Sequence, residues 1–316
     1  MFQYIIRRLL IAIPVLLGVT IFGFFIINLA PGDPVEMQIN PYATETDIEI
    51  RKEALGINDP IYIQYFRWLG SLIKGDFGYS FSTYEPVSQM ILERIGPTMM
   101  LMGTALIIAY LIAIPIGILS ATKQYSWIDY LTTSFSFLGV SIPNFFLGLG
   151  FIYIFSISFN ILPTGGMNTL GSDGGFIDTL KHLILPALVL ATGICGNMVR
   201  YVRSSMLEVF GQDYLRTARA KGLKEVFVVN KHAFRNALLP IITVIGMDIS
   251  LLIGGAVVTE QIFQWPGLGQ LTIQSIGSRD YPTLMAINVL AALSVLFSNL
   301  IADILYSVAD PRIKYN

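Results

Sequence analysis

The chain has 316 residues, of which 54% are apolar and 13% are charged, and its mean hydropathy is +0.65. Soluble domains carry charge on about a quarter of their residues, so this chain has too few polar side chains to cover a soluble globule. The composition therefore excludes an ordinary soluble domain and predicts an integral membrane protein. The net charge of −1 is close to zero, so the positions of the charges are more informative than their sum.

Six apolar runs predict membrane-spanning helices, because a helix needs about 20 largely apolar residues to cross a bilayer. We expect the third and longest run to form one helix that is tilted or kinked at Pro143. The first run exceeds the core of a secretory signal, roughly 7–15 residues, and Pro31 follows directly, so an uncleaved helix is predicted. The runs are residues 9–30, 98–122, 130–157, 183–199, 240–258 and 284–302.

The Lys and Arg residues predict the orientation of these helices, since the inner loops of membrane proteins are enriched in them. With the N-terminus inside, 13 of the 20 Lys and Arg fall on inner segments and 7 on outer segments. We therefore predict an all-α integral membrane protein with six transmembrane helices and both termini inside. Its expected parts are the N-terminus with the first helix (1–30), an extracytoplasmic loop (31–97) and a core of five helices (98–316).

The loop 31–97 is too long for a simple turn and carries ten acidic against five basic residues. It opens on Ala30-Pro-Gly-Asp-Pro34, a cluster that ends the first helix. Within 61–73, aromatic and apolar residues recur at near-helical spacing, which predicts an amphipathic helix. Two compatible interpretations follow: a helix lying at the membrane surface with an aromatic belt, or a small cap that contacts a partner outside.

The inner segment 200–240, between the fourth and fifth runs, holds eight of the 20 Lys and Arg. Residues 212–221 contain no helix breaker and are rich in Ala, Arg and Leu, so they predict a helix that ends at Gly222. Tyr214, Ala218 and Lys221 share one face of this helix.

A second helical stripe follows this glycine, formed by Leu223, Phe227, Phe234 and Leu238. We therefore expect two short helices joined at a glycine bend on the inner side of the membrane. Because Ala218 and Gly222 are small, the bend would let the surface of another protein approach closely. Ser205 and Glu208 have capping-box spacing, although a helix that continues through them is also compatible with the sequence.

Motifs of nucleotide sites, zinc proteases, redox centres and serine hydrolases are absent from the sequence. His182 and His232 fall on opposite sides of the predicted membrane. The single cysteine, Cys195, allows no internal disulfide and is expected to be a small buried apolar residue. The carboxylates form no metal-ligand pattern. We therefore predict no enzyme activity, no cofactor and no metal.

Two acidic residues interrupt the apolar runs, Asp248 in the fifth and Asp303 in the sixth. A charged side chain within a membrane faces the interior of the helix bundle or a water-filled cavity. Asp248 is therefore either a lining residue of a polar path or a polar tie to another helix, for instance to Asn197 or Asn288. Asp303 is close enough to the inner edge of the membrane to be solvated.

The inner segment contains Asp213-Tyr-Leu-Arg-Thr-Ala-Arg-Ala-Lys-Gly222 followed by Arg235-Asn-Ala-Leu-Leu-Pro240. This pair of stretches resembles the EAA loop of binding-protein-dependent ABC importer permeases, and looks most like the peptide and nickel branch. The general pattern has Glu-Ala-Ala where this chain has Arg216-Thr217-Ala218, and a shorter gap before the proline; both departures are usual for the peptide branch. The resemblance extends through Tyr4-Ile-Ile-Arg-Arg8, Ala30-Pro-Gly-Asp-Pro34, Ser141-Ile-Pro-Asn144, Gln261-Ile-Phe-Gln-Trp-Pro-Gly-Leu-Gly269, Arg279-Asp-Tyr-Pro282 and Ala309-Asp-Pro-Arg312.

This resemblance implies a permease subunit of an ATP-driven importer in the cytoplasmic membrane of a bacterium or archaeon. Its implied partners are a second homologous permease, two separate ATP-binding subunits, an extracytoplasmic binding protein and the bilayer, and no nucleic acid. Half of a path for peptides would run through the chain, with Asp248 and Asn197 as candidate path residues; nickel complexes, glutathione and oligosaccharides are alternative substrates. The implied ATPase-coupling residues are Asp213, Tyr214, Thr217, Ala218, Arg219, Lys221 and Gly222.

Two other functions remain compatible with single features of the sequence. An ion-driven secondary transporter would use Asp248 as its coupling residue and would have inverted internal repeats, but no repeat is found. The basic segment 200–240 could bind anionic lipid or nucleic acid. However, Glu208, Asp213 and Glu225 interrupt its positive charges, and the enrichment of inner loops in Lys and Arg already explains them.

Overall fold

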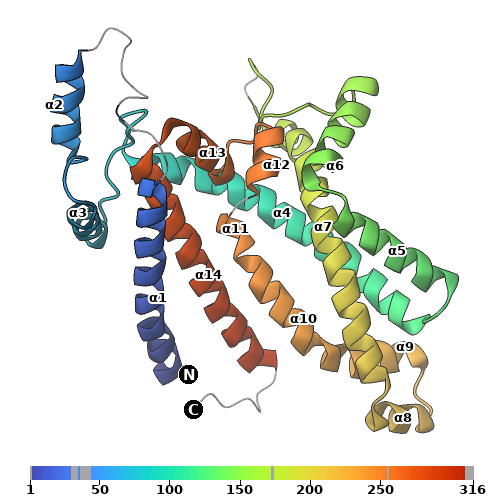
Figure 1. Cartoon of the computed structure of the whole chain (residues 1–316). Coiled ribbons are helices and arrows are strands. Elements are labelled where there is room, and N and C mark those ends of the chain that lie inside the picture. Colours follow the sequence, from blue (N-terminus) through green and yellow to red (C-terminus); the bar gives the residue numbers. More distant parts are fainter. Residues whose placement is uncertain (1, 30–34, 36–43, 172–173, 255, 310–316) are drawn as a thin grey trace.

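Nearly the whole chain folds into helices in the computed structural model, which describes all residues except 1, 30–34, 36–43, 172–173, 255 and 310–316 (Figure 1). Across the described residues, the only paired extended segments form an isolated β-bridge between Tyr79 and Pro86. The all-α prediction is confirmed. The elements are α1 (Phe2–Leu29), α2 (Glu45–Leu55), α3 (Ile61–Ile73), α4 (Val87–Thr122), α5 (Trp127–Ser141), α6 (Asn144–Phe151), η2 (Ile152–Ser158), α7 (Phe176–Phe210), α8 (Asp213–Ala220), α9 (Glu225–Phe227), η3 (Val228–Ala233), α10 (Phe234–Ile249), α11 (Leu251–Gly254), α12 (Val257–Ile262), α13 (Leu268–Ser278) and α14 (Tyr281–Ala309).

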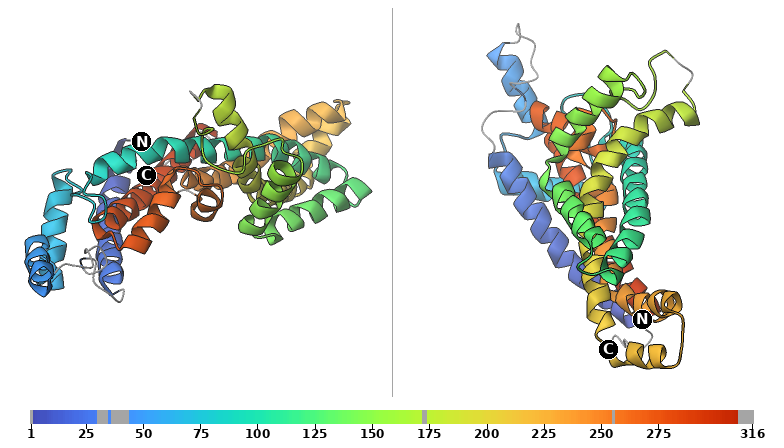
Figure 2. Two further views of the ribbon diagram at one scale, coloured as in Figure 1. Left: turned by 90° about the horizontal axis from the view of Figure 1, so that it is seen from above. Right: turned by 90° about the vertical axis from the view of Figure 1, so that its right-hand side faces the viewer.

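The long helices lie side by side in an open array rather than closing into a bundle (Figures 1 and 2). In this array α14 packs against α1 and α10, α10 also packs on α7, and α7 packs on both α4 and α5. Large apolar side chains stay exposed along it; Phe22 and Leu111, for example, are 72% and 71% exposed. Such surfaces require lipid or partner subunits to cover them.

Five helical stretches of the described chain are long and apolar enough to cross a membrane, or six if the bent pair α5 and α6–η2 counts as one span. The pair carries the chain from the end of the molecule where α4 stops to the end where α7 starts (Figure 1). The start of α1 and the end of α14 lie toward the same end of the array as α8 (Figure 1). A path with six crossings and both termini on one side is compatible with this arrangement.

The third apolar run forms two helical segments, and the prediction of a single tilted or kinked helix is wrong. The break falls next to Pro143, as expected, but the two segments differ in direction by 98°. Ile142 is extended, with φ −77° and ψ 122°, because a residue that precedes proline is disfavoured in the helical region. Pro143 then caps α6, whose first turn needs no amide hydrogen from it.

α7 is the central helix of the core and is much longer than the apolar run that predicted it, with 35 residues. It continues through Ser205 and Glu208, so their capping-box spacing does not mark a helix start. Its C-terminal half buries Met198, Val202 and Met206 in a cluster with side chains from α4, α8, η3 and α10. A Cβ on Gly196 would lie 2.6 Å from the carbonyl oxygen of Ser136, so this glycine lets α5 approach α7 closely.

α3 packs onto α1 and α14 through its aromatic side chains. Tyr65 is buried, its hydroxyl lies 3.0 Å from Oγ1 of Thr20, and its ring packs edge-to-face on Phe24. The predicted helix at 61–73 is thus confirmed, while Tyr62 and Phe66 on the same helix stay exposed. The helix that follows begins at Val87, within the expected loop 31–97 rather than after it.

Candidate functional site

The inner hairpin, residues 211–227, projects beyond the ends of α7 and α10 (Figure 1). α7 ends at Phe210, α8 runs from Asp213 to Ala220, and the chain turns at Gly222 before α9. Gly222 has φ +76°, a left-handed conformation that glycine adopts without steric cost. No atom lies within 4 Å of the position of a Cβ there. Gly222 therefore allows the left-handed turn of the backbone, and the space beside it is not filled by other parts of the chain.

One face of α8 packs onto the rest of the chain and the other is exposed. Leu215 and Ala218 are 0% and 8% exposed and lie in the same cluster as Met206 and Val228. Ala218 was expected to let another protein approach, but its side chain faces the chain's own core. The predicted coupling residues that are exposed are Asp213, Tyr214, Thr217, Arg219, Lys221 and Gly222.

The second predicted helix of the hairpin is not short and does not bury the predicted stripe. α9 continues through the π-helical segment η3 into α10, which is part of the fifth span. A π-helical turn inserts extra residues per turn, which shifts the helix phase, so the expected stripe no longer faces the core. Leu223 and Phe227 are exposed, Phe234 and Leu238 are only half-buried, and the buried residues are Val228, Val229, Ala233, Ala237 and Ile241.

A bidentate ion pair closes the inner hairpin across its turn. Arg219 donates from Nη2 to Oε1 of Glu225 at 2.7 Å and from Nε to Oε2 at 3.1 Å. The hydrogen bonds that Arg219 donates to Glu225 raise the pKa of Arg219 above its already high ordinary value, so the guanidinium stays charged. Both side chains are largely exposed, at 40% and 59%, so this pair fixes the shape of the turn more than it stabilises the fold.

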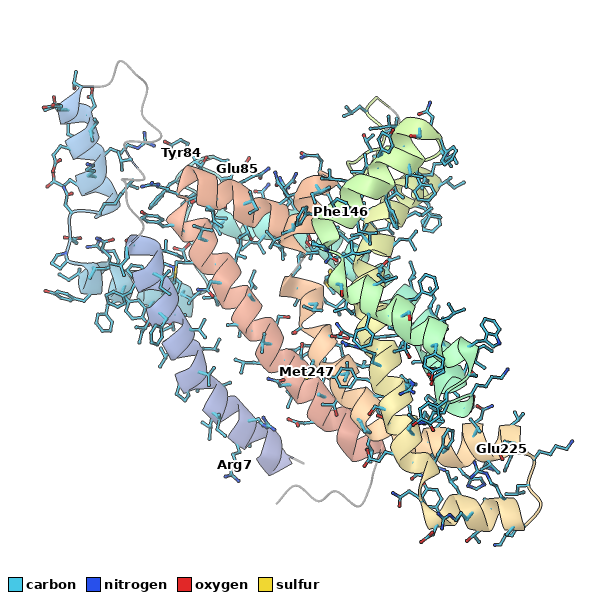
Figure 3. All side chains as sticks on the ribbon, turned by 45° about the vertical axis from the view of Figure 1, so that its right-hand side comes forward. Arg7, Tyr84, Glu85, Phe146, Glu225 and Met247 are labelled. Atoms are coloured by element: carbon cyan, nitrogen blue, oxygen red, sulfur yellow. The ribbon has the colours of Figure 1, made fainter. Side chains whose placement is uncertain are left out.

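A cavity of about 710 Å³ lies among α4, α5, α6, α7, α10, α11 and α12, in the middle of the array. Met247, on the α10 stretch of its wall, is labelled in Figure 3. The cavity wall is mostly apolar, as in small-molecule sites. Its polar side chains are Asn144, Asn197, Tyr201, Asp248 and Thr259.

The structure brings both predicted path residues, Asp248 and Asn197, to this cavity but does not join them to each other. The hydroxyl of Tyr110 on α4 donates to Oδ2 of Asp248 at 2.8 Å. Asn197 accepts a hydrogen bond from Nη2 of Arg200 at 2.6 Å. The expected tie of Asp248 to another helix therefore exists, but its partner is Tyr110 rather than Asn197 or Asn288. Tyr110 gave no signal in the sequence, because a tyrosine within an apolar run is common in membrane helices.

Asp303 differs from its expected solvated state. Its carboxylate is paired with Arg8 of α1, with 2.9 Å between Nη2 and Oδ2, and its side chain is only 14% exposed. The pair links the N-terminal part of α1 to the C-terminal part of α14. Sequence spacing could not predict it, since the two residues lie at opposite ends of the chain.

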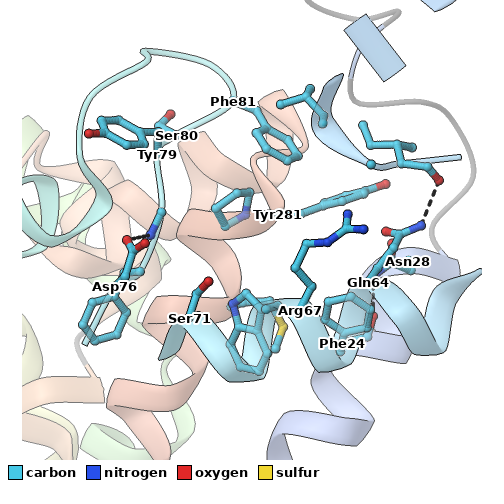
Figure 4. A pocket seen from close by; sticks show the side chains of 18 of the residues that line it. Phe24, Asn28, Gln64, Arg67, Ser71, Asp76, Tyr79, Ser80, Phe81 and Tyr281 are labelled. Carbon is cyan, nitrogen blue, oxygen red and sulfur yellow. Dashed lines mark hydrogen bonds between the residues drawn. The ribbon is translucent and has the colours of Figure 1, made fainter. Parts of the chain in front are cut away.

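A second cavity, of about 380 Å³, lies among α1, α2, α3, the segment 76–84 and the start of α14 (Figure 4). Aromatic side chains of α1, α3 and α14, including Phe24, Trp68 and Tyr281, line it. Arg67 also lines it and donates to Asp59 at 2.6 Å, while Arg51 lies 5.0 Å from the ring centre of Tyr84. This cavity could not be predicted from the sequence, because its wall combines distant segments.

An all-helical array of spans with a mainly apolar, partly polar cavity and a projecting helical hairpin has the parts of a membrane transport subunit. The chain belongs to the family described as "Binding-protein-dependent transport system inner membrane component", whose model matches residues 113–315. The model of that family's N-terminal region matches residues 1–102. The resemblance seen in the sequence is thus confirmed, and the alternative of an ion-driven secondary transporter is not supported.

Relatives with established descriptions match over the whole chain. The chain is 51% identical to the oligopeptide transport system permease protein AppB of Bacillus subtilis, over 100% of both chains. It is 44% identical to a putative peptide permease protein of Brucella suis, over 99% of both, and 39% identical to the glutathione transport system permease protein GsiC of Salmonella paratyphi A, over 100% of both. Its fold resembles a chain of the methionine ABC transporter MetNI in an inward-facing conformation, with TM-score 0.57, 19% identity, and coverage of 72% of this chain and 99% of that chain.

Proposed function

We propose that this chain is a permease subunit of an ATP-driven importer and forms half of a path for peptides across the cytoplasmic membrane. The observation that carries the proposal is the full-length match, at 51% and 44% identity, to permeases named for oligopeptides and peptides. Glutathione, named for relatives at 39% identity and below, is the second candidate substrate. The cavity of about 710 Å³, called here the membrane cavity, supports a path, because its wall places polar side chains among the spans.

The inner hairpin supports a docking role for separate ATPase subunits. It lies at the same end of the array as the start of α1, in line with N-in, C-in orientation from the Lys and Arg distribution. A second permease would cover the apolar surfaces that the open array leaves exposed. A binding protein would deliver the substrate at the opposite end, where Tyr84 and Glu85 lie (Figure 3).

The predicted coupling residues fall into three roles. Asp213, Tyr214, Thr217 and Lys221 form an exposed surface, called here the coupling surface, on which an ATPase would bear. Ala218 and Leu215 pack the buried face of α8 against the core of the chain. Arg219 and Gly222 shape the turn, through the ion pair with Glu225 and the left-handed backbone.

A charge placed on the coupling surface tests the docking role. Thr217→Glu would bury an unpaired carboxylate in the interface with the ATPase, and we expect association to weaken about tenfold or more. The measurement is the amount of ATPase subunit that co-purifies with the permease, together with peptide uptake by the assembled transporter. Both should fall, while the amount of permease in the membrane stays constant.

The matched control is Thr46→Glu, the same change at an exposed threonine of α2 near the opposite end of the array. An added acid in the first turn of a helix is electrostatically favourable, so this variant should associate and transport normally. Normal ATPase association of Thr217→Glu would refute the docking role of the coupling surface. Failure of the wild-type transporter to take up any peptide would instead refute the proposed substrate class.

A further inference from the structure

Asp248 is the one charged side chain among the 17 described residues that line the membrane cavity. The others are apolar or neutral polar. An ionisable group at this depth is costly to insert and serves as a functional-site hypothesis by default. Arg200, which donates to the cavity residue Asn197, lies 5.2 Å above the ring centre of Phe137.

The carboxylate of Asp248 has unused capacity to accept hydrogen bonds. An ionised carboxylate has two oxygens and about four acceptor sites. Tyr110 fills one of them, through the 2.8 Å bond to Oδ2, and no other described residue donates to Asp248. The remaining sites are open to a donor inside the cavity, and a cation would complement both their geometry and their charge.

We propose that Asp248 binds the α-ammonium group of a peptide while the peptide passes through the cavity. The inference rests on the proposed function, because it names the group by which that substrate class would be recognised. Peptides of varied sequence share few features, and the N-terminal ammonium is one of them. It carries three donors and one positive charge, which match a carboxylate with open acceptor sites.

The surroundings of Asp248 fit such a ligand. The cavity of about 710 Å³ falls within the size range of small-molecule sites, roughly 300–1,000 Å³. Asn144, Asn197, Tyr201 and Thr259 are neutral donors and acceptors that suit the amide groups of a peptide backbone. The apolar remainder of the wall places no charge against varied side chains. Tyr110 is a positioning residue, since its bond holds the carboxylate of α10 against α4.

The test uses the complete transporter, with both permeases, the ATPases and the binding protein, in proteoliposomes. The probe is trialanine, whose only cation is its N-terminal ammonium, supplied at saturating loaded binding protein. We expect Asp248→Asn to lower the uptake rate about tenfold, and Asp248→Glu to retain it within about threefold. Glu93→Gln, which removes an exposed carboxylate of α4 outside the cavity, should transport as the wild type does.

The Asn variant separates charge from structure, because its amide oxygen still accepts the hydrogen bond of Tyr110. A second arm uses N-acetyl-trialanine, which lacks the ammonium. The preference for free over acetylated peptide is compared between wild type and Asp248→Asn with the same binding protein, so the selectivity of that protein cancels in the ratio. We expect the preference to fall about tenfold in the variant.

Two outcomes would overturn the assignment. One is wild-type uptake of trialanine by Asp248→Asn; the other is an equal loss on both peptides, which indicates a structural role for the carboxylate. If the wild-type transporter takes up neither peptide, the proposed function itself fails, and the assignment fails with it. Membrane content and ATPase association of each variant are measured alongside, and Asp248→Glu keeps the test decisive if the Asn variant assembles poorly.

Discussion

Asp129 lies in the first turn of α5, and its side chain is only 4% exposed. Its carboxylate accepts four hydrogen bonds. Arg203 of α7 donates to its two oxygens at 2.7 and 2.8 Å, the hydroxyl of Ser120 donates to Oδ1, and the amide of Tyr125 donates to Oδ2 at 2.9 Å. A buried carboxylate with all these partners is fully compensated for its lost hydration. It joins α4, α5 and α7 at one point, about two turns before the end of α7 that carries the inner hairpin.

Removing this carboxylate should destabilise the protein strongly. Asp129→Ala would leave the guanidinium of Arg203, whose side chain is 26% exposed, without its partner, and we expect a loss of about 3–5 kcal/mol. Thermal unfolding in nanodiscs measures it. Arg216→Gln, which removes an exposed ion pair with Asp213, is the control and should change stability by no more than about 0.5 kcal/mol. Equal effects of the two substitutions would contradict the structural role of Asp129.

The contacts of single polar residues could be predicted only in part. That Asp248 would bond to another helix followed from the cost of a charge in lipid, but its partner Tyr110 lies 138 residues away and is one of many aromatics in the spans. Asp303 was expected to be solvated, and its ion pair with Arg8, which lies at the opposite end of the chain, was not predicted. For Asp248, the cost of a charge in lipid predicted a polar environment, whereas the identity of its partner depended on packing.

Among the elements, apolar run length predicted the position of the spans, and local backbone chemistry predicted where they break. Pro143 marks the break between α5 and α6, but the angle of 98° depends on how α6 packs against α7 and α12. The π-helical segment η3 escaped prediction, since the stripe at 223–238 assumed a regular helix. One shift of phase there moved Val228 and Val229 into the core in place of Leu223 and Phe227.

The close packing of α5 on α7 depends on Gly196. An added methyl group would lie 2.6 Å from the carbonyl oxygen of Ser136 and 2.9 Å from Cγ2 of Val140, so the helices must separate. We expect Gly196→Ala to cost about 1–3 kcal/mol and to alter uptake, because Val140 lines the membrane cavity.

Gly70→Ala on α3 is the matched control, since no atom lies within 4 Å of its added methyl group. Alanine favours helix over glycine by up to about 1 kcal/mol, so this variant should be as stable as the wild type or more so. Unfolding temperatures of both variants in the same membrane mimetic give the comparison. A Gly196→Ala protein as stable as Gly70→Ala would show that α5 and α7 are not closely packed in the membrane.

At the scale of the whole molecule, the open array and the inner hairpin have a common physical reason. A helix array with exposed apolar side chains must meet lipid or another subunit, and the chain itself covers only one face of a hairpin that projects past the spans. Composition alone predicted the membrane environment. Charge distribution alone predicted the orientation, which remains a prediction, as does the crossing of the membrane by the bent pair α5 and α6–η2.

Chemical labelling of single cysteines would test this orientation. The background is Cys195→Ser, which removes the native cysteine. Exposed positions then receive one cysteine each: Glu85 and Thr217 at opposite ends of the array, and Gln124 and Ile161 before and after the bent pair. A membrane-impermeant maleimide added to intact cells lacking an outer barrier should label Glu85→Cys and Ile161→Cys. It should label Thr217→Cys and Gln124→Cys only after the membrane is opened.

The four positions separate the two readings of the bent pair. If α5 and α6–η2 together make one crossing, Gln124→Cys and Ile161→Cys differ in access, and the chain crosses six times with both termini inside. If the pair enters and leaves on one side, the two positions label alike, the number of crossings becomes odd, and the termini lie on opposite sides. Labelling of Thr217→Cys from outside would place the inner hairpin away from the cytoplasmic ATPases and would contradict the coupling role itself.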